Sequence, residues 1–289
     1  MQITIITPTY NRAHLLPSLY ESLKIQKCPN LIWLVVDDGS TDDTEAVIQE
    51  FQKEAKITIE YLKQKNQGKH IAFNTGIKRT KTPLVLNIDS DDQMMEGAIH
   101  YIKTLLPEFL ENKNIAAIAF PRFSEAKNSV KTNKAIPFSK TIISSIDLVH
   151  HYQLSGEFEY LFKTEIVKQF PFPQFNNEKF IKESLILKRI DKIYNYLYVK
   201  KPIVKGEYLE DGLSTDFRGL LEKNPKGSAL AYLEITNDPR FTFSERKEAF
   251  KNYWYFENIS KQHSKLQRLM RVKKKDVIFS FIYGKLFNS

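Results

Sequence analysis

Residues 87–92 read Asn87-Ile88-Asp89-Ser90-Asp91-Asp92 and place three carboxylates directly after the apolar run Thr82-Pro83-Leu84-Val85-Leu86. That run, bounded by Pro83, predicts a short central strand. Unpaired carboxylates are costly in a protein core, so these side chains should have a partner. Side chains two residues apart on a strand point the same way, so Asp89 and Asp91 are expected to converge on a divalent cation such as Mg²⁺ or Mn²⁺. The alternative is a solvated acidic turn.

The other residues of this N-terminal part alternate between apolar runs and helical patterns. Strands are predicted over residues 2–7, 31–36 and 57–62, each followed by a helix. The run 31–36 is apolar on both faces, which predicts a sheet covered by helices on both sides. We therefore expect an α/β fold with a doubly wound, mostly parallel sheet, whose ligands bind beyond the carboxyl ends of the strands. The residues expected to meet there are Thr7, Asp37, Asp38, Lys69 and Asp89–Asp92.

Four segments of the chain carry a family resemblance. In chain order they are Thr7-Pro8-Thr9-Tyr10-Asn11-Arg12, Val36-Asp37-Asp38-Gly39-Ser40-Thr41-Asp42, Asn66-Gln67-Gly68 and Asn87-Ile88-Asp89-Ser90-Asp91-Asp92. Their order and spacing resemble the motifs of glycosyltransferase family 2. The resemblance implies the GT-A fold and an inverting transfer of sugar from a nucleotide-diphospho-sugar.

The same resemblance implies a role for individual side chains. Asp38 would hydrogen-bond the nucleotide base, Asp89 would face the ribose or the diphosphate, and Asp91 would bind the divalent metal, Mn²⁺ or Mg²⁺. Together the residues implied to bind the nucleotide-sugar are Thr7, Pro8, Tyr10, Asp38, Lys69, Asp89 and Ser90.

The third segment departs from the family pattern. Members often carry Arg directly before an Asn, whereas this chain has Ala72-Phe73-Asn74. A cation for the diphosphate must then come from elsewhere, and Lys69 or His70 is the nearest candidate. Lysine suits a phosphate as a compact point charge. The alternative for Lys69 is an exposed lysine at the start of a helix.

The second half of the chain is expected to supply the acceptor site and a base. Family members carry an acidic pair at the start of a helix with Arg farther on, and Lys182-Glu183-Ser184-Leu185-Ile186-Leu187-Lys188-Arg189 has that spacing with lysine at the first acid. The resemblance makes Glu183 the general base, with Glu178 as the rival. The alternative for Glu183 is an acid favoured by the helix dipole. Asp211 falls where some relatives place a metal-binding histidine, although Asp211-Gly212 is also an ordinary turn pair.

Length and composition fit one sizeable core with an appendage. The chain has 289 residues, of which 42% are hydrophobic. We predict a catalytic domain over residues 1–220, with a nucleotide-sugar half at 1–100 and an acceptor half at 101–220, and a helical, basic extension over 221–289.

The single cysteine, Cys28, excludes an internal disulfide framework and suits a reducing cytosol. We expect no signal peptide, and no apolar run reaches the length of about 20 residues that spans a membrane.

The positive charge is concentrated in the predicted extension. From residue 261 onward eight Lys and Arg side chains face only Asp276, a net +7 of the chain's +9. The basic segment runs into the apolar, aromatic stretch over residues 277–287. This combination predicts peripheral contact with an anionic membrane surface through residues 265–287. The alternative is a basic helix packed on the catalytic domain, with the apolar stretch covering a groove or a dimer partner.

These features predict a metal-dependent hexosyl- or N-acetylhexosaminyltransferase. Its expected donor is a UDP-sugar, and its expected acceptor is a glycan or a lipid-linked hydroxyl on the cytoplasmic face of the membrane, in surface polysaccharide or lipopolysaccharide synthesis. A sugar-phosphate nucleotidylyltransferase would need a Gly-rich basic loop where residues 7–12 lie. A nucleic-acid binder is disfavoured, because the acidic crevice would repel phosphate. A non-catalytic binding relative would have lost Asp91 or every candidate base, and this chain retains them.

Overall fold

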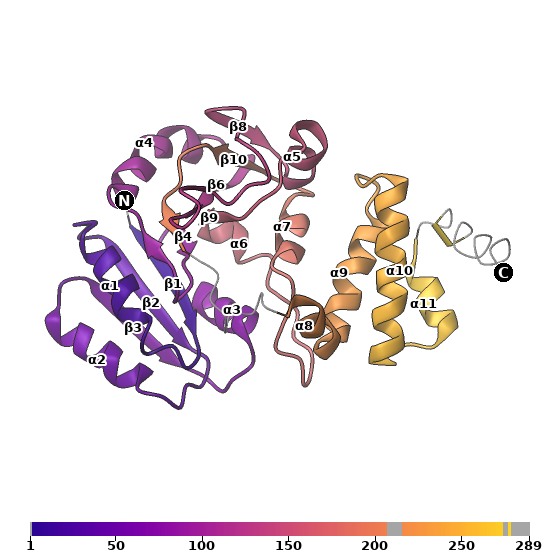
Figure 1. Cartoon of the computed structure of the whole chain (residues 1–289), viewed down its shortest axis with the longest axis horizontal. Coiled ribbons are helices and arrows are strands. Elements are labelled where there is room, and N and C mark those ends of the chain that lie inside the picture. The colour runs from indigo at the N-terminus through magenta and orange to yellow at the C-terminus, as the bar shows by residue number, and fades with distance from the viewer. Residues whose placement is uncertain (1, 207–215, 274–276, 279–289) are drawn as a thin grey trace. The chain divides into compact units, whose positions relative to one another are not determined.

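The computed structural model describes residues 2–206, 216–273 and 277–278 (Figure 1). These residues divide into two compact units. The first unit lies within residues 1–172 and 186–209, and the second within residues 173–185 and 210–289. Among the described helices, none is both long and apolar enough to cross a membrane.

Four parallel strands form one half of the sheet in the first unit. In the order β3-β2-β1-β4 they are β3 (Thr58–Lys63), β2 (Leu31–Asp37), β1 (Ile3–Thr9) and β4 (Leu84–Asn87). The helices between them are α1 (Leu16–Lys24), α2 (Thr44–Glu54) and α3 (Lys69–Arg79). The alternation of strands and helices thus produces the predicted parallel arrangement, and all four carboxyl ends lie at one edge of the sheet.

The other half of the sheet is mixed, which the sequence did not predict. β9 (Phe158–Lys163) pairs antiparallel with both β4 and β6 (Ile115–Ser124) and lies between them. β10 (Asn195–Val199) is parallel to β6, while β8 (Lys140–Ile143) and β7 (Ser129–Val130) are antiparallel to their neighbours. The helices here are α4 (Ala98–Glu111), α5 (Ser145–Tyr152), α6 (Thr164–Val167) and α7 (Ser184–Ile190). Because β9 is antiparallel to both β4 and β6, these two strands run in the same direction, and β6 ends at the same edge of the sheet as β4.

A short ladder holds the loop that follows β4. β5 (Gln93–Met94) pairs antiparallel with β11 (Val204–Lys205), and β11 also pairs in parallel with Arg122 and Phe123 at the end of β6. The backbone N–H of Gly206 extends the ladder by donating to the carbonyl oxygen of Phe123 at 3.1 Å. The aspartate-rich loop is therefore fixed at one end by β4 and at the other by β5.

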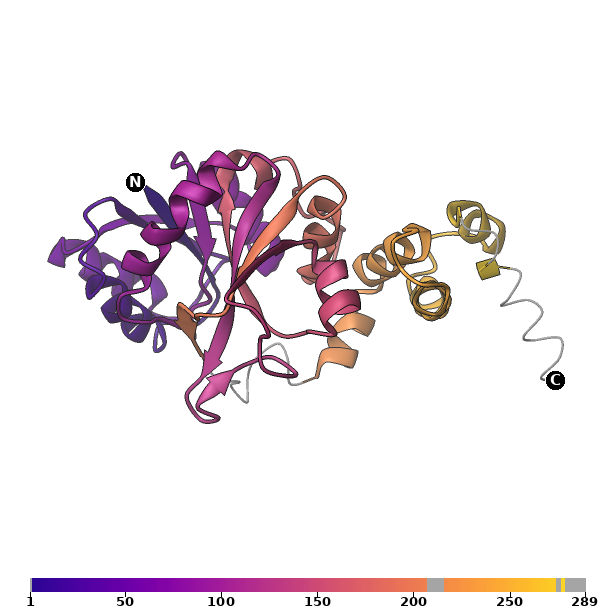
Figure 2. The same ribbon diagram turned by 90° about the horizontal axis from the view of Figure 1, so that it is seen from above.

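Helices pack on both faces of the sheet, as the apolar second strand predicts. On β2, Trp33 and Val35 belong to a core cluster completed by α1, α2 and α4, whereas Leu34 and Val36 belong to a cluster completed by α3, α5 and α6 (Figure 2). The indole N–H of Trp33 donates to the hydroxyl of Thr7 at 2.9 Å, and both side chains are fully buried. Burial of an apolar side chain such as Leu34 or Val35 stabilises the fold by about 1.5–3 kcal/mol.

The second unit is helical, which confirms the predicted helical C-terminal part over its described residues. Its helices are α8 (Phe217–Lys223), α9 (Pro225–Asn237), α10 (Phe243–Ser260) and α11 (Lys265–Arg271). Capping boxes begin two of them, formed by Thr242 with Glu245 for α10 and by Ser264 with Gln267 for α11. The core of this unit is rich in aromatic side chains, among them Phe250, Tyr253 and Phe256.

Candidate active site

Backbone and side-chain hydrogen bonds join the loops that follow β1 and β2. The N–H of Asn11 donates to the hydroxyl of Ser40 at 2.9 Å, and the Asn11 side-chain oxygen accepts from the N–H of Thr41 at 2.8 Å. The N–H of Ala13 donates to the carboxylate of Asp42 at 3.0 Å. The first two sequence motifs therefore form one connected surface at the carboxyl edge of the sheet.

Asp38 connects this surface to the third motif. Its buried carboxylate accepts from the backbone N–H groups of Gln67 and Gly68, at 2.9 and 2.7 Å, and from the side chain of Gln64 at 2.8 Å. Charge-assisted bonds of this kind are stronger than neutral ones. Asp38 thus fixes the segment that leads into α3, in addition to the base contact that the family resemblance predicts for it.

The residues predicted to bind the nucleotide-sugar differ in the exposure of their side chains. Thr7 is fully buried, with its hydroxyl accepting from Trp33, and Pro8 is buried beside it. Ser90 is also buried, whereas Tyr10 is 47% exposed. Of these positions, Tyr10 offers the largest accessible side chain at this edge, and an aromatic ring can stack on a planar base.

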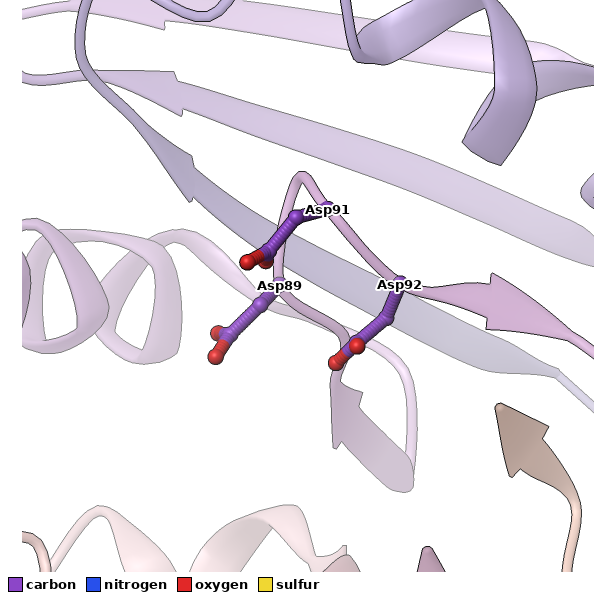
Figure 3. Close-up of side chains that lie close together, drawn as sticks. All are labelled: Asp89, Asp91 and Asp92. Atoms are coloured by element: carbon purple, nitrogen blue, oxygen red, sulfur yellow. The ribbon is translucent and has the colours of Figure 1, made fainter. Parts of the chain in front are cut away.

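The three aspartates gather in a turn between β4 and β5. β4 ends at Asn87, so the prediction that Asp89 and Asp91 point the same way because both lie on a strand is wrong. Instead the backbone N–H of Asp92 donates to the carbonyl oxygen of Asp89 at 3.1 Å and closes a turn. The side chains leave this turn toward the same side (Figure 3), and one carboxylate oxygen from each lies within 4.8 Å of the others. The predicted convergence is therefore present, through a turn and with Asp92 included.

Lys69, the first residue of α3, compensates part of this negative charge. Its Nζ lies 2.7 Å from Oδ2 of Asp89, while the Asn87 side-chain amide donates to Oδ1 of Asp89 at 3.0 Å. Burial would raise the pKa of Asp89, but the charges of Lys69 and Arg122, together with the hydrogen bonds from Lys69 and Asn87, outweigh it and lower that pKa. The candidate cation for the diphosphate is thus bonded to the first aspartate of the motif. His70, the weaker candidate, is buried and packs edge-on against Phe172.

Arg122, at the end of β6, is a site residue that the sequence analysis missed. Its guanidinium contacts the carboxylate of Asp92 and lies 3.4 Å from carboxylate oxygens of both Glu157 and Glu159. Burial would lower the pKa of Arg122, but Glu159 and Asp92 outweigh it and raise that pKa. Burial raises the pKa of Asp92 to about 7, and Arg122 opposes that rise. Arg122 is therefore the cation that allows Asp92 to lie inside the protein.

A signal for Arg122 exists in the sequence. Arg122 follows the apolar run over residues 115–120, so it is a polar residue just after a buried segment, as the aspartates are after the run that forms β4. Only the pairing of β9 between β4 and β6 shows that both strand ends lie at one edge. Gly206 completes the contact, because a Cβ there would lie 1.7 Å from Oδ1 of Asp92.

The second unit contains both candidates for the general base. Glu178 is 7% exposed, and its two carboxylate oxygens accept from the backbone N–H groups of Lys226 and Gly227, at 2.7 and 2.8 Å. It therefore caps the start of α9, and burial raises its pKa. Glu183 is exposed and directly precedes α7. Asp211, the second predicted metal ligand, lies outside the described residues.

Replacing Arg122 with Met should destabilise the first unit by about 3–5 kcal/mol, because it removes the cation from a buried charge cluster and leaves the carboxylates behind. Arg122→Lys keeps a positive charge and should lose a smaller part of this stability. Chemical denaturation of both variants measures the difference. Wild-type stability of Arg122→Met would show that the carboxylates do not depend on this arginine.

Comparison with known families and proteins extends the resemblance beyond the motifs. The model of glycosyl transferase family 2 matches residues 4–169, more than half of the chain. The GalNAc(5)-diNAcBac-PP-undecaprenol beta-1,3-glucosyltransferase of Campylobacter jejuni is 25% identical over 238 residues, which cover 81% of this chain and 72% of that enzyme. TuaG of Bacillus subtilis, a putative teichuronic acid biosynthesis glycosyltransferase, is 33% identical over 141 residues, covering 48% of this chain and 52% of TuaG.

Solved structures show the same fold at lower sequence identity. Residues 1–349 of TarS of S. aureus, in complex with UDP-GlcNAc, superimpose with a TM-score of 0.58 at 19% identity, covering 92% of this chain and 74% of that fragment. The mannosyltransferase PcManGT of Pyrobaculum calidifontis, in complex with GDP-Man and Mn²⁺, gives a TM-score of 0.56 at 15% identity, covering 97% of this chain and 80% of PcManGT. These likenesses confirm the predicted GT-A fold. The chain belongs to glycosyl transferase family 2 and is a glycosyltransferase.

Proposed function

We propose that this chain is a metal-dependent, inverting glycosyltransferase that moves a sugar from a UDP-sugar to a hydroxyl of a glycan or lipid-linked acceptor. The observation that carries the proposal is the convergence of Asp89, Asp91 and Asp92 at the edge where the parallel strands end. Ligands of such sheets bind at this edge. The UDP-GlcNAc complex of TarS, a protein of the same fold, supports a UDP-sugar as the donor.

The three carboxylates suit a divalent cation. They offer hard oxygen ligands within 4.8 Å of one another, the kind that Mg²⁺ and Mn²⁺ prefer. Within the described residues no hydrogen-bond donor reaches the buried Oδ2 of Asp92, an atom that a cation would satisfy. Asp91 is the proposed principal ligand, and Asp211 the proposed second one. A bound Mn²⁺ or Mg²⁺ would stabilise negative charge on the departing nucleoside diphosphate.

We propose that the nucleotide lies along the loops after β1 and β2. The ring of Tyr10 would stack on the base, while Thr7, Pro8 and Asp38 would shape the base site. Lys69 would bind the diphosphate, since it already lies at the aspartate cluster and lysine pairs well with phosphate. Asp89 and Ser90 would face the ribose or the diphosphate.

The transfer itself needs a base on the acceptor side. In the proposed step Glu183 removes the proton of the acceptor hydroxyl as the oxygen attacks the anomeric carbon, and the bond from that carbon to the diphosphate oxygen breaks. Exposure of Glu183 favours this role. Glu178 is the weaker candidate, because both of its oxygens already accept hydrogen bonds from α9.

The acceptor and the location are further parts of the proposal. The Campylobacter relative is named for an undecaprenol-linked acceptor, and TuaG for teichuronic acid biosynthesis. We infer a role in surface polysaccharide or lipopolysaccharide synthesis at the cytoplasmic face of the membrane. The basic segment 265–287 would keep the enzyme near such acceptors.

Asp91→Asn should abolish metal-dependent donor binding, because it replaces the proposed principal ligand with a neutral amide. Titrating UDP into the protein, with Mn²⁺ or with a chelator, measures this by calorimetry. Glu111→Gln is the matched control, since Glu111 is an exposed carboxylate at the end of α4, which leads into the start of β6 and not into a loop assigned to the nucleotide. Retention of metal-dependent UDP binding in Asp91→Asn would place the metal elsewhere.

Glu183→Gln and Glu178→Gln should have opposite effects. Glu183→Gln should keep donor binding and stability but lower the rate of transfer by at least about 10²-fold, as loss of a general base does. Glu178→Gln should weaken the cap of α9, lowering stability by about 1–2 kcal/mol, and largely preserve the rate. Thermal unfolding and single-turnover kinetics separate the two. A normal rate in Glu183→Gln together with a lost rate in folded Glu178→Gln would reverse the assignment.

A further inference from the structure

Helix α11 buries an arginine and exposes two apolar side chains, the reverse of what a surface helix normally does at those positions, although its Leu269 packs inward. Its Arg268 is only 7% exposed, whereas Leu266 and Met270 are 69% and 75% exposed. These are the two most exposed large hydrophobic side chains in the described part of the chain. They stand four positions apart on the helix and so project from one face. A surface helix normally places its apolar side chains inward and its charges outward.

A buried carboxylate on α10 explains the inward arginines. Glu257 is fully buried and accepts from Nδ1 of His263 at 2.8 Å and from Arg271 at 3.1 Å, with Nε of Arg268 3.6 Å away. Arg268 also donates to the carbonyl oxygen of His263 at 2.8 Å. A buried charge needs such partners, so this network fixes the rotation of α11 about its axis. Leu266 and Met270 are thereby held outward.

Three lysines lie close to this apolar face in the sequence: Lys261 at the end of α10, Lys265 on α11 itself and Lys273 just after it. Lys261, Lys265 and Lys273 are exposed, and none forms an ion pair with an acidic side chain of the described residues. In the sequence, Lys274 and Lys275 follow directly. Two protruding apolar side chains with lysines close to them in the sequence match the chemistry of an anionic lipid surface, which attracts lysine side chains. An apolar protein partner would gain nothing from this charge.

We propose that α11 is a membrane-docking element, in which Leu266 and Met270 insert between lipids while Lys261, Lys265 and Lys273 contact anionic headgroups. The proposal rests on the membrane contact proposed above for residues 265–287 and names the side chains that make it, but it does not depend on glycosyl transfer. It also narrows the predicted membrane contact of the basic tail, because Arg268 and Arg271 are engaged by Glu257, and the apolar face of α11 is assigned to the lipid.

Vesicle flotation of the full chain tests this proposal, with phosphatidylcholine vesicles compared with vesicles that also contain phosphatidylglycerol. The wild type should float with the anionic vesicles alone. Replacing both Leu266 and Met270 with Gln should weaken this binding by at least about tenfold, because it removes the apolar area that enters the lipid. The matched control is Ile193→Gln, which removes an exposed apolar side chain of the first unit, 66% exposed, and should leave binding unchanged.

Three readouts distinguish the alternatives. Replacing Lys261, Lys265 and Lys273 with Gln should remove the preference for anionic vesicles. Undiminished flotation of the Leu266 and Met270 double variant would overturn the proposal, and a simultaneous change in its oligomeric state would assign the face to contact between copies. Donor hydrolysis by the double variant should equal that of the wild type, so lipid binding and the proposed enzymatic function can fail independently.

Discussion

Three carboxylates that offer oxygen atoms within 4.8 Å of one another repel. In the first unit, cationic side chains offset this repulsion. Each partner reaches the cluster from a different element. Lys69 comes from the start of α3 and Arg122 from the end of β6, and they contact the first and third aspartates. Asp91 lies between these pairs and has no ion-pair partner among the described residues. The middle carboxylate is therefore the one left to bind the proposed cation.

The topology of the sheet is what brings these charges together. β9 lies antiparallel between β4 and β6, so that Arg122 reaches the same edge as the aspartates. The β5–β11–β6 ladder then fixes the far end of the aspartate turn, with Gly206 packed directly on Asp92. Any side chain larger than hydrogen at position 206 would collide with that pair. The charge cluster and the local strand pairing are thus mutually dependent.

Sequence patterns were sufficient for the parallel half of the fold and insufficient for the rest. The strands that end at Thr9, Asp37 and Asn87 follow from apolar runs, and the polar residues after them from topology. The turn at Asp89 and the pairing of Arg122 were missed, because they depend on which strands become neighbours. Likewise, the inward arginines of α11 could not be predicted without Glu257, whose burial is a property of the packed helices.

The central claim is that the aspartate cluster binds a metal that presents a nucleotide-sugar. The most direct measurement is a panel of UDP-, GDP- and TDP-sugars, scored by thermal shift and by slow release of nucleotide, with Mn²⁺ or with a chelator. We predict that a UDP-sugar stabilises the protein and is slowly hydrolysed only when the metal is present. A response to no donor, or an equal response with the chelator, would contradict the claim.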